Sequence, residues 1–226
     1  MRHSDVQAWV TIDGEELPEY QLAPRARRRK SPTKCWIQSE AGETFTVHWK
    51  DLRHGRLLFV KLLIDGVLVD GGLITINPKD KHSAPLGCQL DSNMCRTFFH
   101  EGFPISEGKM RYFVFSHLLC ADNDEKNHSK LGTIELRISK ATICPNIKLV
   151  ADTLSPNADP TQKRNTASGK VVACQGHCVQ PGDEVEDRPT TYFEGIKTGK
   201  KPFVTFIFRY RPKDPASKSN PTAIDH

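Results

Sequence analysis

The chain of 226 residues lacks any long apolar run, although 37% of its residues are hydrophobic. Apolar stretches such as Leu57–Val60 are far shorter than the roughly 20 residues that a membrane-spanning helix needs. The first 20 residues also lack the uninterrupted apolar segment of a secretory signal. We therefore expect an intracellular protein that is neither secreted nor bound to a membrane.

A paired cysteine framework is missing as well. The chain has seven cysteines, an odd number, and most of them are scattered. Small secreted domains instead carry an even and dense set of cysteines that form disulfides. We expect reduced thiols at these positions, which are Cys35, Cys88, Cys95, Cys120, Cys144, Cys174 and Cys178.

No window of a dozen residues shows apolar residues at the spacing of three and four that an amphipathic helix requires. Short runs with strand character follow one another instead, separated by Gly, Pro and Asp. This pattern predicts an all-β protein, an antiparallel β-sandwich of the jelly-roll or Greek-key type with long loops and little helix. The expected strands are 6–12, 34–38, 44–49, 57–64, 67–69, 73–76, 96–99, 111–117, 133–139, 171–174 and 203–210.

Two connections between these strands have a specific prediction. The strands 34–38 and 44–49 are joined by five residues that include Gly42, which is typical of a β-hairpin. The pair Asp65-Gly66 follows an apolar strand and predicts a tight turn.

We expect one sandwich domain over residues 1–212. It contains a basic loop at 22–34 and a flexible insertion at 151–169, which is almost free of large apolar side chains. The tail 213–226 contains two prolines and no apolar period, so we expect it to be disordered.

The positive charge is concentrated in one segment. Residues 21–39 hold six cations and no acid, and subtracting six from the net charge of +5 leaves −1 for the rest of the chain. Such a run is compatible with nuclear import or with contact to nucleic acid or another anionic partner, but a solvated loop without a partner is the simpler explanation. The cations are Arg25, Arg27, Arg28, Arg29, Lys30 and Lys34.

One group of residues could take part in a metal site. Cys174, His177 and Cys178 offer two thiols and an imidazole within five residues. A structural zinc site needs four ligands, and no second Cys/His pair of similar spacing is present. Ordinary thiols in a strand and turn are the simpler interpretation, and we expect no cofactor.

Complete catalytic motifs are also absent. The sequence contains neither the Gly-x-Ser-x-Gly elbow of hydrolases nor a phosphate-binding loop. A third hypothesis is an enzyme that uses a Cys/His pair which only the fold brings together. The sequence instead favours a non-enzymatic protein without catalytic residues.

The last expected strand combines aromatic residues with cations, as strands that bind single-stranded RNA do. Alternation would send Val204, Phe206, Phe208 and Tyr210 to one face and the two arginines Arg209 and Arg211 to the other. We therefore expect the rings to be buried and the arginines to lie at the surface.

Three passages resemble an uncharacterised fungal family, domain of unknown function 7918. They comprise Trp9–Tyr20 with Cys35–Phe45, then Ile64-Asp65-Gly66 with Leu131–Ile138, and finally Pro202–Pro212. The most specific part is the ending F-x-F-R-Y-R-P, which consists of Phe206, Phe208, Arg209, Tyr210, Arg211 and Pro212. The resemblance implies an intracellular β-rich domain and carries no known activity.

Together these observations predict a non-catalytic intracellular β-sandwich that acts as a binding or interaction module, with another protein as the expected partner. The alternative is a nuclear protein that contacts nucleic acid through the basic loop 25–34. Without such an import signal, we expect the protein in the cytoplasm.

Overall fold

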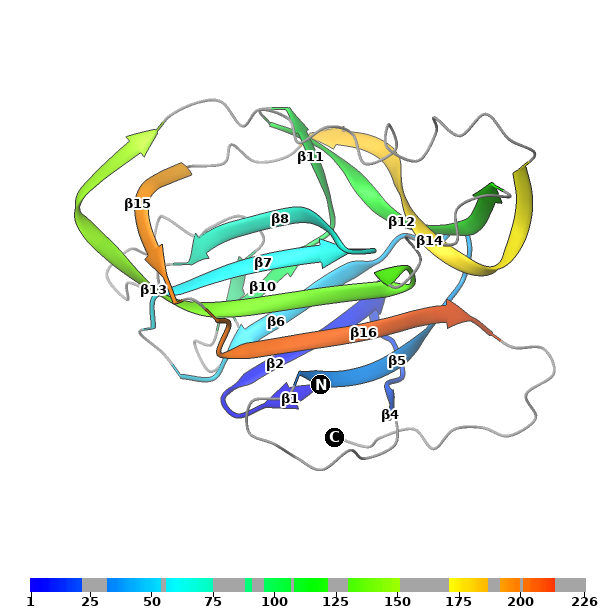
Figure 1. The fold of residues 1–226 in the computed structure, drawn as a ribbon, viewed down its shortest axis with the longest axis horizontal. Helices are drawn as coiled ribbons and strands as arrows, with labels where there is room; N and C mark the ends of the chain where they lie inside the picture. The colour runs from blue at the N-terminus through cyan, green and yellow to red at the C-terminus, as the bar shows by residue number, and fades with distance from the viewer. Residues whose placement is uncertain are drawn as a thin grey trace.

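The computed structural model describes residues 1–21, 32–53, 56–74, 88–90, 96–106, 108–121, 130–150, 171–186, 192–199 and 201–213. Strands account for most of this part of the chain, and no α-helix occurs in it (Figure 1). The predicted all-β class is confirmed. The same part contains no helix that is long and apolar enough to cross a membrane.

The strands form three sheets. The six-stranded sheet has the order β1 (Arg2–His3), β2 (Val6–Ile12), β6 (Thr46–Asp51), β10 (Arg96–His100) and β9 (Cys88–Leu90), with β3 (Glu15–Glu16) paired to β2. The seven-stranded sheet has the order β4 (Tyr20–Gln21), β5 (Thr33–Ser39), β16 (Val204–Pro212), β13 (Thr133–Val150), β7 (Leu58–Ile64) and β8 (Val67–Ile74), with β15 (Tyr192–Thr198) paired to β13. The three-stranded sheet has the order β11 (Gly102–Ser106), β12 (Lys109–Ala121) and β14 (Val171–Glu186).

The six- and seven-stranded sheets bury alternate side chains in one hydrophobic core. Trp49 of β6 stacks on Phe98 of β10 at a ring distance of 4.5 Å. From the seven-stranded sheet come Ile37, Leu136 and Phe206, each 0% exposed. This alternation of buried and outward residues is what a two-sheet sandwich requires, and it agrees with the predicted architecture.

The predicted hairpin between 34–38 and 44–49 is wrong. β5 pairs with β4 and β16, whereas β6 pairs with β2 and β10. The connection forms backbone hydrogen bonds with β12 instead, since the amides of Gly42 and Phe45 donate to the carbonyls of Phe115 and Phe113. It is thus a corner between two sheets, in which the two strands separate.

The predicted turn at Asp65-Gly66 is confirmed, because β7 and β8 form an antiparallel pair that closes at Ile64 and Val67. Gly66 has a φ of 81°, in the left-handed region that favours glycine.

Asp65 also joins distant segments. One carboxylate oxygen accepts hydrogen bonds from the Gly132 amide at 2.9 Å and from the Tyr210 hydroxyl at 2.5 Å. The other oxygen accepts from the Val179 amide at 3.3 Å. A single buried carboxylate therefore connects the β7–β8 turn with the start of β13, with β14 and with β16.

Several expected features lie outside the described residues. They are most of the basic loop, the insertion 151–169 and the tail beyond Lys213. Thr33 and Lys34 belong to β5, so the strand begins within the range predicted as the basic loop.

Candidate functional site

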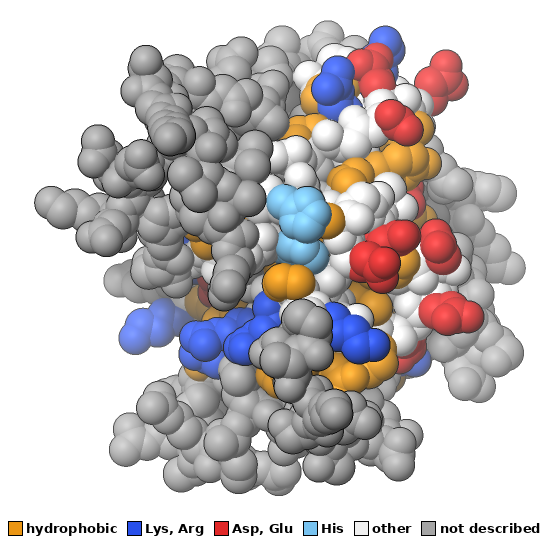
Figure 2. Space-filling view, turned by 90° about the vertical axis from the view of Figure 1, so that its right-hand side faces the viewer, with side chains coloured by type: hydrophobic (Ala, Val, Ile, Leu, Met, Phe, Trp, Pro, Cys, Tyr) orange, Lys and Arg blue, Asp and Glu red, His pale blue; other side chains and the backbone are white. Residues whose placement is uncertain are grey.

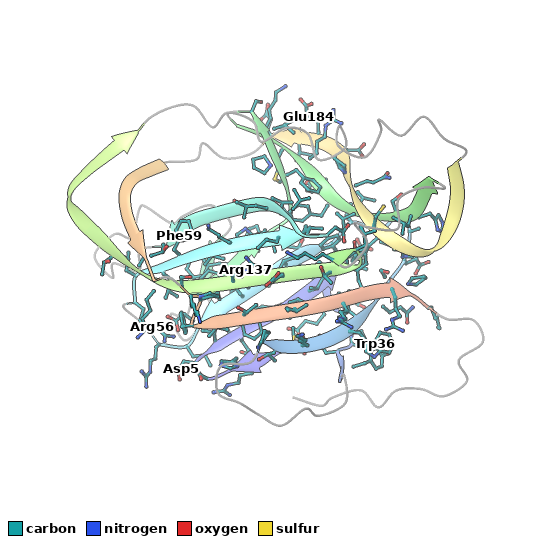
Figure 3. The ribbon with its side chains drawn as sticks, viewed as in Figure 1. Asp5, Trp36, Arg56, Phe59, Arg137 and Glu184 are labelled. Atoms are coloured by element: carbon teal, nitrogen blue, oxygen red, sulfur yellow. The ribbon has the colours of Figure 1, made fainter. Side chains whose placement is uncertain are left out.

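The outer face of β5 and β16 carries three exposed cations, Lys34, Arg209 and Arg211, which we call the cation strip. The two strands run parallel, with Lys34 opposite Ile207 and Arg209 opposite Trp36. Because side chains alternate along a strand, the neighbouring residues of both strands point into the core and the cations point outward. Figure 3 shows Trp36 at this part of the sheet.

Trp36 is held between the strands on either side of it. Its ring stacks on Tyr20 of β4, with ring centroids 4.4 Å apart and planes at 20°. The guanidinium carbon of Arg211 lies 5.4 Å from the centroid of the same ring. A guanidinium that rests on an aromatic ring keeps its planar N–H groups for hydrogen bonds to an anion. The Trp36 ring therefore leaves the N–H groups of Arg211 available for hydrogen bonds.

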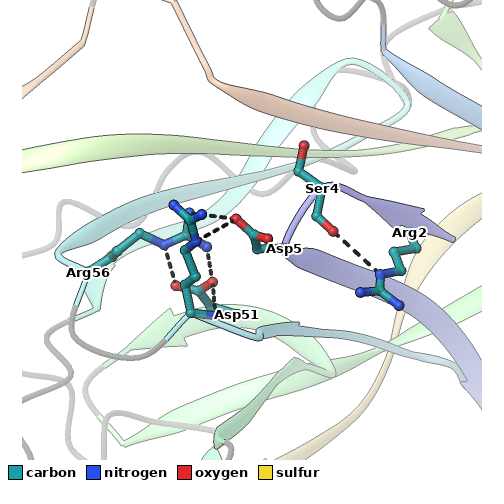
Figure 4. A network of polar contacts seen from close by, with 6 residues as sticks. Arg2, Ser4, Asp5, Asp51 and Arg56 are labelled. Carbon is teal, nitrogen blue, oxygen red and sulfur yellow. Dashed lines mark hydrogen bonds and ion pairs between the residues drawn. The ribbon is translucent and has the colours of Figure 1, made fainter.

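Some other cations in the described structure are paired with carboxylates. Arg137 forms two hydrogen bonds with Glu135, at 2.8 and 2.9 Å. The Arg56 guanidinium contacts Asp51 and Asp5, as Figure 4 shows. The hydrogen bond from the Arg56 side chain to Asp51 raises the pKa of Arg56.

The cation strip differs from these pairs. Within the described part of the chain, no salt bridge joins Lys34, Arg209 or Arg211 to an acid. Glu135, which lies opposite Ile207 on the adjacent strand β13, already binds Arg137. The strip thus presents positive charge that no described carboxylate neutralises.

Figure 2 views the side of the molecule at which β16 and the three-stranded sheet end in Figure 1. One band of this surface carries Lys and Arg side chains, and histidine side chains lie together next to it. At the upper edge of the view, Lys and Arg side chains lie beside Asp and Glu side chains, so both signs of charge meet there.

The residues of the motif F-x-F-R-Y-R-P lie in the structure as predicted. Phe206 and Phe208 are buried at 0% exposure, Arg209 and Arg211 are exposed, and Pro212 ends β16. Of the predicted basic motif, only Lys34 lies within the described residues. The other members, Arg25, Arg27, Arg28, Arg29 and Lys30, lie outside them.

The predicted metal-like group lies on β14, although the side chain of Cys174 is outside the described ones. The Nδ1 atom of His177 lies 2.8 Å from the hydroxyl of Ser39, and the thiol of Cys178 donates to the carbonyl of His117 at 3.6 Å. Among the described side chains, no group of three or more His, Cys, Asp or Glu could hold a metal ion. His177 instead faces His117 of β12 across the sheet, with ring centroids 5.3 Å apart.

Sequence reasoning missed the contact between His117 and His177. The two residues are 60 positions apart, and only the antiparallel register of β12 and β14 brings them together. No spacing rule could have found this pair.

Ser39 and His177 have the contact of a nucleophile with its base, but Ser39 is only 2% exposed. A serine that is sealed in this way cannot reach a substrate. Burial raises the pKa of the Cys35 thiol, which keeps this cysteine protonated at neutral pH. Neither group offers an activated nucleophile at the surface.

The model of the family DUF7918, a domain of unknown function, matches residues 5–216. No curated protein and no solved structure matches the chain. The matched segment includes the Asp65 turn and the Tyr210 strand that this carboxylate joins. Since the match covers nearly the whole chain, the protein belongs to the DUF7918 family.

Proposed function

We propose that this protein is a non-catalytic intracellular binding module that holds an acidic segment of a protein partner on the outer face of β5 and β16. The observation that carries the proposal is the cation strip, whose three exposed side chains have no carboxylate partner among the described residues. Arginine and carboxylate groups form strong hydrogen bonds in pairs, and Arg211 already has a fixed orientation over Trp36.

The ring contacts favour carboxylates over nucleobases as the ligand. Single-stranded nucleic acid usually stacks its bases on free aromatic faces. Trp36 contacts Tyr20 from β4 and Arg211 from β16, the strands on its two sides. Its ring is therefore already packed by side chains of the protein itself.

A second candidate is a nuclear protein that contacts nucleic acid through the basic loop 25–34. One observation favours it: the basic run directly precedes β5, and Lys34 of that strand belongs to the cation strip. In that case the strip and the run would contact phosphates together, without base stacking.

Fluorescence anisotropy with the full chain tests the proposal. The two probes are a labelled glutamate-rich peptide and a single-stranded oligonucleotide of equal length and net charge. The double variant R209A/R211A removes two strip cations. Its matched control, K61A/K140A, removes two exposed lysines of β7 and β13 from the same sheet.

We expect the peptide to bind the natural protein and the control with equal affinity, and to bind R209A/R211A at least 10-fold more weakly. Equal losses in both double variants would contradict the proposal, because only net charge would then matter. Tighter binding of the oligonucleotide, lost when Arg27 to Arg29 are replaced by alanine, would establish the second candidate instead.

A further inference from the structure

We propose that His117 and His177 together bind one divalent transition-metal ion of the Zn²⁺ type. The two residues are direct partners in the antiparallel pair of β12 and β14. The cation strip has no part in this inference, which rests on the cross-strand imidazoles alone.

The ring geometry suits a shared ion. The centroids of the two imidazoles are 5.3 Å apart, and the ring planes meet at 74°. Two imidazoles whose nitrogens lie about 2.0–2.1 Å from one tetrahedral ion have centroids roughly 5 Å apart. The observed separation therefore allows both rings to coordinate the same ion with little movement of the strands.

Ser39 orients one of the two ligands. Its hydroxyl lies 2.8 Å from Nδ1 of the buried His177, which leaves Nε2 as the coordinating nitrogen. Histidines that bind metals usually have a hydrogen-bond partner on their second nitrogen, and this partner fixes the direction of the ring. Ser39 is in this sense a positioning residue for His177.

The exposure of His117 also suits metal binding. This side chain projects from β12 towards solvent. An ion at this position can therefore complete its coordination with water.

The side chain of Cys178 does not take part in this site. Its thiol donates to the carbonyl of His117, so it links the backbones of β14 and β12 at the position of the pair. The metal-like group predicted from the sequence thus has one member in common with the site, His177, while the second imidazole comes from another strand.

Titration calorimetry of the full reduced chain with Zn²⁺ at neutral pH tests the inference. His117→Ala removes an exposed ligand and should not disturb the fold. His226→Ala is the control, since it also removes one histidine. Ser39→Ala retains both imidazoles and removes only the partner of Nδ1, and Cys174→Ser with Cys178→Ser removes the thiols of the sequence motif.

We expect one equivalent of Zn²⁺ to be lost in His117→Ala and retained in His226→Ala and in the double cysteine variant. In Ser39→Ala, the affinity of this equivalent should fall about 10–100-fold. Identical Zn²⁺ titration curves for the natural protein and His117→Ala would overturn the inference. So would loss of the ion in the cysteine variant but not in His117→Ala.

Discussion

The two faces of β16 have opposite roles. On the inner face, Val204, Phe206, Phe208 and Tyr210 are at most 4% exposed and form part of the core. On the outer face, Arg209 and Arg211 are exposed and have no acidic partner among the described residues. One strand thus contributes both to the stability of the sandwich and to the surface that we propose for binding.

This difference divides the motif F-x-F-R-Y-R-P into two sets. The aromatic residues stabilise the fold, and the Tyr210 hydroxyl donates to Asp65 of the Ile64-Asp65-Gly66 passage. The arginines contact no described carboxylate and are available to a partner. The motif therefore combines residues of the core with arginines of the surface that we propose for binding.

The largest effect should come from the inner face. Phe206→Ala removes a ring that is 0% exposed and leaves a cavity, which should lower the free energy of unfolding by about 3–5 kcal/mol. Ile207 is the next residue and lies half-buried on the outer face. Ile207→Ala should therefore lower the free energy of unfolding clearly less than Phe206→Ala does. Urea unfolding of both variants checks this order, and equal costs would show that the two faces do not differ.

Tyr210→Phe keeps the buried ring and removes the hydroxyl that donates to Asp65. Because the acceptor is a carboxylate, we expect a loss of about 1.5–3 kcal/mol in the free energy of unfolding. Tyr20→Phe is the matched control, because it preserves the ring stack on Trp36. Thermal or urea unfolding compares the two. A Tyr210→Phe variant as stable as the control would contradict a stabilising role for the hydrogen bond between Tyr210 and Asp65.

The next prediction concerns how stability depends on pH through His48, an outward residue of the six-stranded sheet. His48 of β6 stacks on Trp9 at 5.4 Å, and its Nε2 atom lies 2.8 Å from the Thr11 hydroxyl. Burial, followed by the charge of His100, lowers the pKa of His48 to about 4. The folded protein therefore binds fewer protons than the unfolded chain between about pH 6.5 and 4.

Stability should consequently fall as the pH decreases from 6.5 towards 4, by at most about 1.4 kcal/mol per unit for this one group before solvent screening reduces it. His177 adds to the loss in the same direction, since its pKa is also lowered. His48→Phe keeps a ring and removes the proton site, so the slope in urea unfolding should become shallower. An unchanged slope would contradict the assignment to His48.

The sequence predicted the strand character, the turn at Asp65 and the two faces of β16, because these depend on local alternation and on residues adjacent in the chain. It did not predict the parallel pairing of β16 with β5, which joins segments more than 160 residues apart. For the same reason it predicted a hairpin where the chain passes from one sheet to another. The position of Trp36 beside Arg211 also follows from that long-range pairing.

The candidate site was therefore only partly visible in the sequence. The charge of Arg209 and Arg211 and their outward direction were predictable from alternation. The sequence did not show that these arginines adjoin Lys34 or that no described carboxylate pairs with them. Both facts depend on which strands are neighbours and on the ion pair between Arg137 and Glu135.

The salt dependence of peptide binding shows whether the outer face of β5 and β16 is an anion-binding surface. The dissociation constant of the glutamate-rich peptide is measured over a series of salt concentrations for the natural protein, R209A/R211A and K61A/K140A. We predict that R209A/R211A binds the peptide more weakly and with a clearly shallower salt slope, since fewer ionic contacts are formed. The free energy of unfolding of R209A/R211A should stay within about 0.5 kcal/mol of that of the natural protein. The same salt slope and affinity in the natural protein and R209A/R211A would contradict anion binding at this face.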